Sequence, residues 1–217
     1  MTGVQTCALP ISLSHDEVVH EKGSLLARMP GDDWQRFANL RMLLSYQWLF
    51  PGKKLLFMGG EIGQSSEWSE NSEVAWWLLD QGPYHRGVQR LMENLNQLYQ
   101  LEPALWQSDY DPEGFFWVDC SDHESGVLSF VRQTKDRSRC VLVVLNMTPI
   151  PRSKYRIGLP QSGQWQEVLN SDAAVYGGSN MGNLGGVTAD NYKVHNQPFS
   201  ARFVLPPLSV AVFRPEH

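Results

Sequence analysis

The chain has 217 residues, of which 42% are hydrophobic, and a formal net charge of −5. This length and apolar content suffice for one or two packed cores, so we expect a globular protein. The negative charge and the scarcity of Lys/Arg blocks argue against a nucleic-acid partner. No apolar run approaches the ~20 residues of a membrane span, so we expect no membrane partner either.

The cysteines indicate a compartment rather than a site. The chain has three cysteines, Cys7, Cys120 and Cys140. Their odd number and wide spacing predict neither a disulfide framework nor a close pair of metal ligands. This pattern favours a reducing cytoplasm. The sequence has no acidic loop with calcium-site spacing, and we expect neither a metal nor a cofactor.

The first eleven residues are set apart from the rest. Residues 1–11 resemble the translation of a common sequencing adapter read from a GTG start, and they have no periodic apolar face. We therefore interpret them as a non-native segment and expect native sequence to begin near Ser12, with the natural protein continuing upstream. The alternative is a genuine N-terminal strand.

The next hundred residues alternate between strand and helix patterns. A short strand is expected just before His15. Apolar residues recur every three or four positions in 33–50 and 87–101, which predicts two amphipathic helices. Between them, residues 54–58 predict a strand buried on both faces of a parallel sheet. Two successive βα units are the repeat of an α/β barrel or of a doubly wound sheet.

Beyond Pro112 the chain changes to short β-type runs separated by Gly, Pro, Asp and Ser. The Gly-rich stretch 176–186 lacks a phosphate-binding ending, and we interpret it as a loop. The expected strands are 115–120, 127–133, 140–147, 155–159, 165–169 and 199–213. This pattern predicts an antiparallel β-sandwich over 112–217.

Two sets of polar residues directly follow the predicted barrel-type strands. His15, Asp16 and Glu17 follow the first strand, and Glu61 follows the second. Active sites in α/β barrels lie at the carboxyl ends of strands. A carboxylate there can accept hydrogen bonds from vicinal sugar hydroxyls, which strengthen as the ring gains oxocarbenium character. Taken without other information, a surface loop or a helix-capping Asp is the simpler explanation of the His-Asp pair.

Several ordered motifs carry a family resemblance. They are the strings 13–26, 37–41 and 51–61 and the loop 176–186, and together with shorter matches they cover nearly everything after Ser12. In these segments the chain resembles the bacterial 1,4-alpha-glucan (glycogen) branching enzymes of the alpha-amylase superfamily. The resemblance implies that 12–111 are the last two βα units of a (β/α)8 barrel and that 112–217 are a C-terminal β-sandwich. A whole barrel takes ~250 residues, so the barrel here is incomplete.

The resemblance also implies an activity for a longer parent protein. Branching enzymes cut an α-1,4-glucan chain and rejoin the piece through an α-1,6 bond. Asp16 matches the carboxylate that stabilises the transition state together with the adjacent His15. From its position after a strand, Glu61 is expected to contact the substrate, and the alternative is that it braces other residues of the cleft. The nucleophile and the general acid, which a retaining mechanism places ~5 to 5.5 Å apart, would lie upstream of residue 12. We therefore expect the chain by itself to be inactive.

The chain departs from the family pattern near the predicted site. Glu21 stands where Gly is common, and the segment 64–68 lacks the Trp that usually follows its Gln. We expect Glu67 to be a surface charge, and Trp68, Trp76 and Trp77 to be packed or half-buried rather than sugar-stacking.

Two other functions stay open. In the first, the parent protein is a debranching-type α-glucan hydrolase. In such an enzyme water, rather than a sugar hydroxyl, attacks the glycosyl-enzyme. Alternatively, 112–217 is a non-catalytic glucan-binding module, and the incomplete barrel part is sticky or disordered because its sheet edges lack partners.

Overall fold

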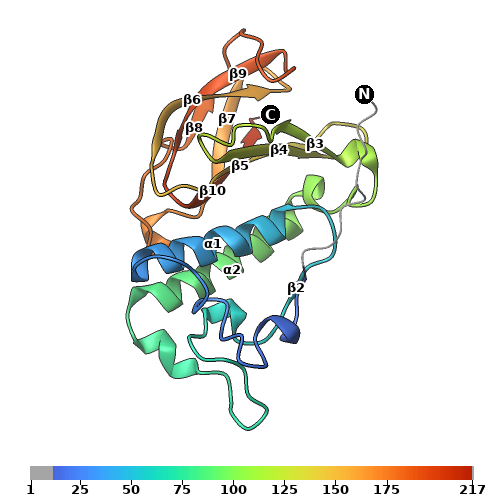
Figure 1. Cartoon of the computed structure of the whole chain (residues 1–217). Coiled ribbons are helices and arrows are strands. Elements are labelled where there is room, and N and C mark those ends of the chain that lie inside the picture. Colours follow the sequence, from blue (N-terminus) through green and yellow to red (C-terminus); the bar gives the residue numbers. More distant parts are fainter. Residues whose placement is uncertain (1–11, 217) are drawn as a thin grey trace.

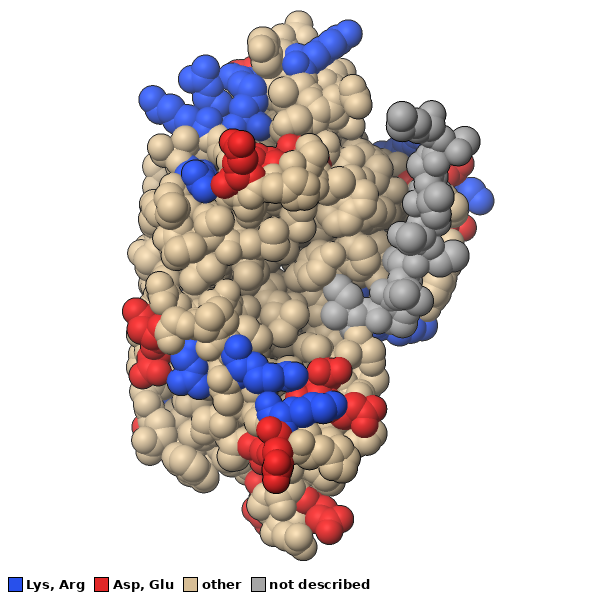
Figure 2. All heavy atoms as spheres, viewed as in Figure 1, with Lys and Arg blue, Asp and Glu red and all other residues tan. Residues whose placement is uncertain are grey.

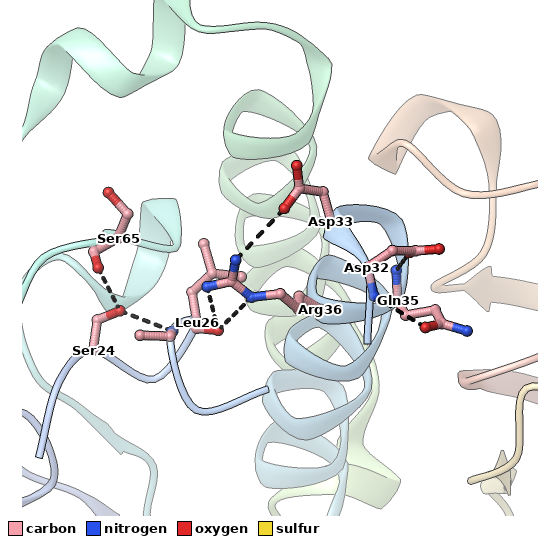
Figure 3. Close-up of polar contacts among 8 residues, drawn as sticks. Ser24, Leu26, Asp32, Asp33, Gln35, Arg36 and Ser65 are labelled. Atoms are coloured by element: carbon pink, nitrogen blue, oxygen red, sulfur yellow. Dashed lines mark hydrogen bonds and ion pairs between the residues drawn. The ribbon is translucent and has the colours of Figure 1, made fainter. Parts of the chain in front are cut away.

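The helical layer consists of two long helices with well-defined ends. The computed structural model describes residues 12–216. Helix α1 (Asp33–Leu49) begins with a capping box in which Asp32 Oδ1 accepts from the Gln35 N–H and the Gln35 side chain accepts from the Asp32 N–H (Figure 3). Helix α2 (Pro83–Leu101) begins with proline in its first turn. The predicted start at Gly87 was wrong by one turn, because the apolar periodicity begins only at Val88.

The β-part forms two antiparallel sheets, as predicted. The larger sheet has six strands in the order β3-β4-β5-β10-β7-β8, and the smaller one pairs β6 with β9. The strands are β3 (Phe115–Asp119), β4 (Val127–Gln133), β5 (Cys140–Asn146), β6 (Arg152–Leu159), β7 (Gln164–Asn170), β8 (Gly186–Thr188), β9 (Phe199–Leu205) and β10 (Ser209–Pro215).

The larger sheet is covered on both faces, so the molecule has three layers (Figure 1). Helices α1 and α2 cover one face, and the β6–β9 pair covers the other. Strand β5 shows this arrangement directly, since all seven of its residues are buried. Its Val141 and Val143 belong to the core shared with the helices, whereas Leu142 and Val144 belong to the core between the two sheets. The second core contains the fully buried Trp165.

One predicted strand is in fact two. The run 199–213 divides into β9 and β10, which lie in different sheets. The break falls at Pro206 and Pro207, which lack the N–H that a ladder needs, and at Leu208, which has a φ of +46°.

Buried polar contacts join the helices to the β-part. The Arg132 guanidinium, from β4, donates to the carbonyls of Leu49 and Leu105 and to the Asp109 carboxylate. Arg41, from α1, donates to the Ser171 carbonyl after β7. The expectation that the incomplete barrel part is sticky or disordered is therefore wrong for its helices, which share a core with the larger sheet.

The 176–186 loop is docked on helix α2. The Tyr176 hydroxyl donates to Asn94 Oδ1 at 2.8 Å. A Cβ at Gly87 would meet the Tyr176 carbonyl oxygen at 2.3 Å, so only glycine permits this approach.

The two N-terminal strands are short and parallel. Strand β1 (Ser12–Leu13) pairs with β2 (Leu55–Leu56), with Leu13 opposite Leu56. The prediction that 54–58 is buried on both faces was wrong: Leu55 is 49% exposed and Met58 is 45% exposed. Within residues 12–216, β1 is the one strand that pairs with β2. A closed barrel is accordingly not seen in this part of the chain.

The remaining sequence predictions concern the cysteines and a membrane-spanning helix. Cys120 and Cys140 are free thiols, while residues 1–11, including Cys7, lie outside the described residues. Among residues 12–216, no helix combines the length and apolar content needed to cross a membrane.

Candidate functional site

The predicted site residues follow β1 and β2 at the same edge of the strand pair. Because β1 and β2 are parallel and in register, the turns that follow them emerge on the same side. The first turn is the short 3-10 helix His15–Glu17, and the second is Gly60–Ile62. The Phe57 N–H donates to the Leu13 carbonyl at 2.9 Å and continues the ladder up to this edge.

His15 and Asp16 form an exposed polar pair. His15 Nε2 lies 3.1 Å from Asp16 Oδ1, and their side chains are 57% and 66% exposed. The residue that caps the turn is Ser14, whose hydroxyl accepts from the Asp16 N–H. Asp16 is therefore not the helix cap. Its carboxylate contacts the His15 ring instead. Lys22 Nζ donates to the Asp16 backbone carbonyl at 2.6 Å and fixes the turn from outside.

The His15 ring also has an aromatic neighbour that the sequence did not indicate. The Phe57 ring lies 6.0 Å from the His15 ring, tilted by 58°, and the Trp68 ring packs edge-on against Phe57 at 5.4 Å. Phe57, which directly follows β2, thus flanks the His15 ring and is itself backed by Trp68.

Glu61 lies in a short 3-10 turn that is bracketed by two glycines. Gly59 and Gly63, at φ +87° and +64°, bracket the turn, and the Gln64 N–H donates back to the Gly59 carbonyl. His85 Nδ1 lies 2.9 Å from the Ile62 carbonyl, and because a carbonyl only accepts, this nitrogen carries the proton. Within residues 12–216, the structure records no hydrogen bond or ion pair of the Glu61 side chain, and its role stays a prediction.

The hollow between the two turns is small. Leu25, Phe57, Gly60 and Trp68 are among the residues that line it, and its volume is about 20 Å³. This space suits a water-sized group and not a sugar ring. A sugar would have to lie on the open surface beside His15 and Asp16.

The surface charge around the site is mixed. Asp and Glu side chains lie at the lower tip of the molecule, and Lys and Arg side chains lie beside acidic ones in the lower half as well as at the top, over β6 and β9 (Figure 2). Lys22 and Arg28 contact the site turn itself, at the Asp16 carbonyl and the Glu17 carboxylate. Across residues 12–216, no group of three or more His, Cys, Asp or Glu side chains is arranged to hold a metal ion.

The side chains near the site agree only in part with the predictions. Glu67 is partly exposed, as a surface charge should be, but its Oε1 also accepts from the Glu21 N–H at 2.8 Å, a contact that was not predicted. The prediction that Trp76 and Trp77 are packed or half-buried was wrong, because they are 52% and 62% exposed. The Glu67 contact has no local sequence signal, since it joins residues 46 positions apart. The two tryptophans begin the 3-10 helix Trp76–Asp80, of which only Leu78 is buried.

Comparison with known proteins first identifies the class of the β-part. Residues 117–216 match the alpha amylase, C-terminal all-beta domain. The crystal structure of Ttha1563 from Thermus thermophilus has a similar fold, with a TM-score of 0.61 over 89% of this chain and 34% of that chain, at 22% identity. The β-part is thus similar to the all-beta domain found at the C-terminus of alpha-amylases.

Nearly the whole chain is similar to the 1,4-alpha-glucan branching enzymes. It is 54% identical over 95% of its length to 1,4-alpha-glucan branching enzyme GlgB from Aquifex aeolicus, and 52% identical over 94% to the enzyme of the same name from Cereibacter sphaeroides. It spans only 32% and 28% of the length of these two relatives.

Proposed function

We propose that this chain is a C-terminal part of a 1,4-alpha-glucan branching enzyme that acts in glycogen biosynthesis in the cytoplasm. In this proposal 12–111 are the last two βα units of a (β/α)8 barrel, and 112–217 are its C-terminal β-sandwich. The parallel pairing of β1 and β2, each followed by a helix, supports the barrel assignment. The observation that carries the proposal is the identity of about half of all positions over 95% of the chain.

The proposed substrate is an α-1,4-glucan chain, with no nucleic acid or membrane involved. In a retaining transfer, a carboxylate nucleophile attacks the anomeric carbon while a carboxylic acid protonates the leaving sugar, so that the α-1,4 bond breaks. The 6-hydroxyl of an acceptor chain then attacks the glycosyl-enzyme and forms the α-1,6 bond, and its proton passes to the acid/base residue.

Three residues of this chain have roles in that reaction. The Asp16 carboxylate accepts hydrogen bonds from ring hydroxyls, and these bonds strengthen as positive charge develops on the ring. His15 donates to a neighbouring hydroxyl of the same sugar, and Glu61 contacts the glucan from the second strand end. The exposure of the His15–Asp16 pair leaves both side chains accessible to such a ring.

The chain by itself is proposed to be inactive. Asp16 stabilises charge but does not supply the nucleophile and acid pair, which must stand ~5 to 5.5 Å apart across the scissile bond. We expect no α-1,6 branches when the isolated chain is incubated with amylose.

A chimera tests the proposal. In the Aquifex aeolicus enzyme, the segment that matches this chain is replaced by residues 12–217, and branch points are counted after debranching of the product. We expect a branching chimera in which Asp16→Asn lowers kcat by about 10²- to 10³-fold, while Glu70→Gln, an exposed acid farther along the chain, leaves it unchanged.

The products separate the alternatives. A folded chimera that releases reducing ends without new branches would support the hydrolase instead. Glucan binding by residues 112–217 with full activity of the Asp16→Asn chimera would favour the binding-module function.

A further inference from the structure

The loop that carries His15 and Asp16 is fastened to the segment that follows the second strand turn. We define residues 14–24 as the site loop and residues 64–68 as the clamp segment. The Trp68 N–H donates to the Val18 carbonyl at 3.0 Å, and the Glu21 N–H donates to Glu67 Oε1 at 2.8 Å. The Ser24 hydroxyl donates to the Ser65 carbonyl at 3.0 Å (Figure 3). These three hydrogen bonds hold the C-terminal half of the site loop.

The site loop contains backbone strain at the residue that Glu67 contacts. His20 and Glu21 have φ values of +59° and +65°, a left-handed conformation that side-chain-bearing residues rarely adopt. Such a conformation persists only when surrounding contacts stabilise it. The Glu67 carboxylate provides a charge-assisted hydrogen bond to the Glu21 N–H, which is at the strained position itself.

Trp68 reaches His15 by two routes. Through side chains, its ring packs against Phe57, which packs against His15. Through the backbone, its N–H bonds to the Val18 carbonyl, and the Val18 N–H in turn bonds to the His15 carbonyl at 2.9 Å. Trp68 is therefore linked to both the ring and the backbone of His15.

We infer that Glu67 and Trp68 are positioning residues that hold the site loop in the conformation that presents His15 and Asp16 to a ligand. The placement of the loop follows from these contacts alone. The consequence for turnover rests on the proposed function.

The first test measures the loop in the chain itself. Amide exchange of Glu21 and the ring proton resonances of His15 are followed by NMR, with His15→Gln to assign the ring. We expect Glu67→Ala to accelerate Glu21 exchange by about tenfold or more, whereas Glu67→Gln, which keeps an acceptor oxygen, stays close to the parent. Glu70→Ala is the matched control, because Glu70 is an exposed acid close to the clamp segment.

The tryptophan is tested in the same way. Trp68→Ala is expected to shift the His15 ring resonances, and Trp68→Phe to preserve them, because a phenyl ring retains the contact with Phe57. Unchanged β5 amide resonances show that each variant is folded. If folded Glu67→Ala exchanges at Glu21 as Glu70→Ala does, or if folded Trp68→Ala leaves His15 unmoved, the inference is overturned.

The second test measures turnover in the chimera. Glu67→Ala is expected to lower kcat by about tenfold with KM nearly unchanged, and Glu67→Gln to restore most of the loss, since misplacement of a stabilising group affects the transition state more than the bound substrate. An active chimera with unchanged kcat in Glu67→Ala refutes the positioning role. Indifference to Asp16→Asn instead refutes the proposed function, and the NMR result then still decides the loop contact.

Discussion

Replacing Asp109 by Asn should strongly destabilise the junction between the helices and the larger sheet. The Asp109 and Arg132 side chains are 7% and 0% exposed, and they form the most deeply buried ion pair of the described residues. Burial lowers the pKa of Arg132, and the Asp109 carboxylate opposes this shift. The Asn variant leaves a buried guanidinium without its counter-charge.

Removing one partner of a buried pair costs about 3 to 5 kcal/mol of unfolding free energy. For a chain of this size that is a fall in Tm of about 6 to 20 °C. The two backbone carbonyls that Arg132 also contacts remain, which favours the lower half of the range.

The matched control is Asp80→Asn. Asp80 pairs with Arg86 at 2.7 Å, but the two side chains are 77% and 65% exposed, and such pairs contribute about 0 to 1 kcal/mol. Both variants are compared with the parent chain by urea unfolding and by calorimetry. Equal midpoints for Asp109→Asn and Asp80→Asn would refute the reasoning, because burial would then make no difference.

Three further predictions concern other parts of the fold. Gly87→Ala should cost about 1 to 3 kcal/mol, since its Cβ overlaps the Tyr176 carbonyl oxygen, and should make the 176–186 loop more sensitive to protease; an undiminished Tm would contradict the close approach. Burial lowers the pKa of Lys54 to about 8, below its unfolded value of 10.5, so the folded state binds fewer protons between these values and stability should rise with pH from 8 to 9.5. Lys54→Met should flatten this rise in urea titrations, and an equally steep rise in the variant would assign it to another group. Burial also raises the pKa of Cys140 to about 12, so mass mapping after thiol alkylation at pH 8 should find Cys120 modified and Cys140 intact until the chain unfolds.

Local signals predicted the helices and most strands well. Helix α1 was placed to within one residue, because Asp32, Pro51 and Gly52 mark its ends by short-range chemistry. Strand β4 was predicted with its observed bounds. The errors arose where distant parts of the chain decide the outcome: an apolar run such as 54–58 signals a strand, but only its neighbours determine whether it is buried.

At the site, too, local signals identified residues, whereas contacts between distant parts of the chain had no signal. His15, Asp16 and Glu61 were selected because each follows a strand, and the structure places them after two parallel neighbours. Their roles stay predictions. The contact of Glu67 with Glu21 had no signal in the sequence. Every residue except proline has a backbone N–H, so the sequence does not indicate which of them a carboxylate will contact.

The larger sheet, buried on both faces, limits how freely the β-part can be treated as an interchangeable module. A cut at Pro112 would pass between the helices and the strands that share their first core, and it would leave Phe130, Val143 and Val212 facing water. Fusion or truncation designs that follow the sequence boundary would therefore expose an apolar surface that is prone to association. A transferred segment that includes 33–111 keeps the helices that cover this surface, and it is therefore the better unit to transfer into another protein.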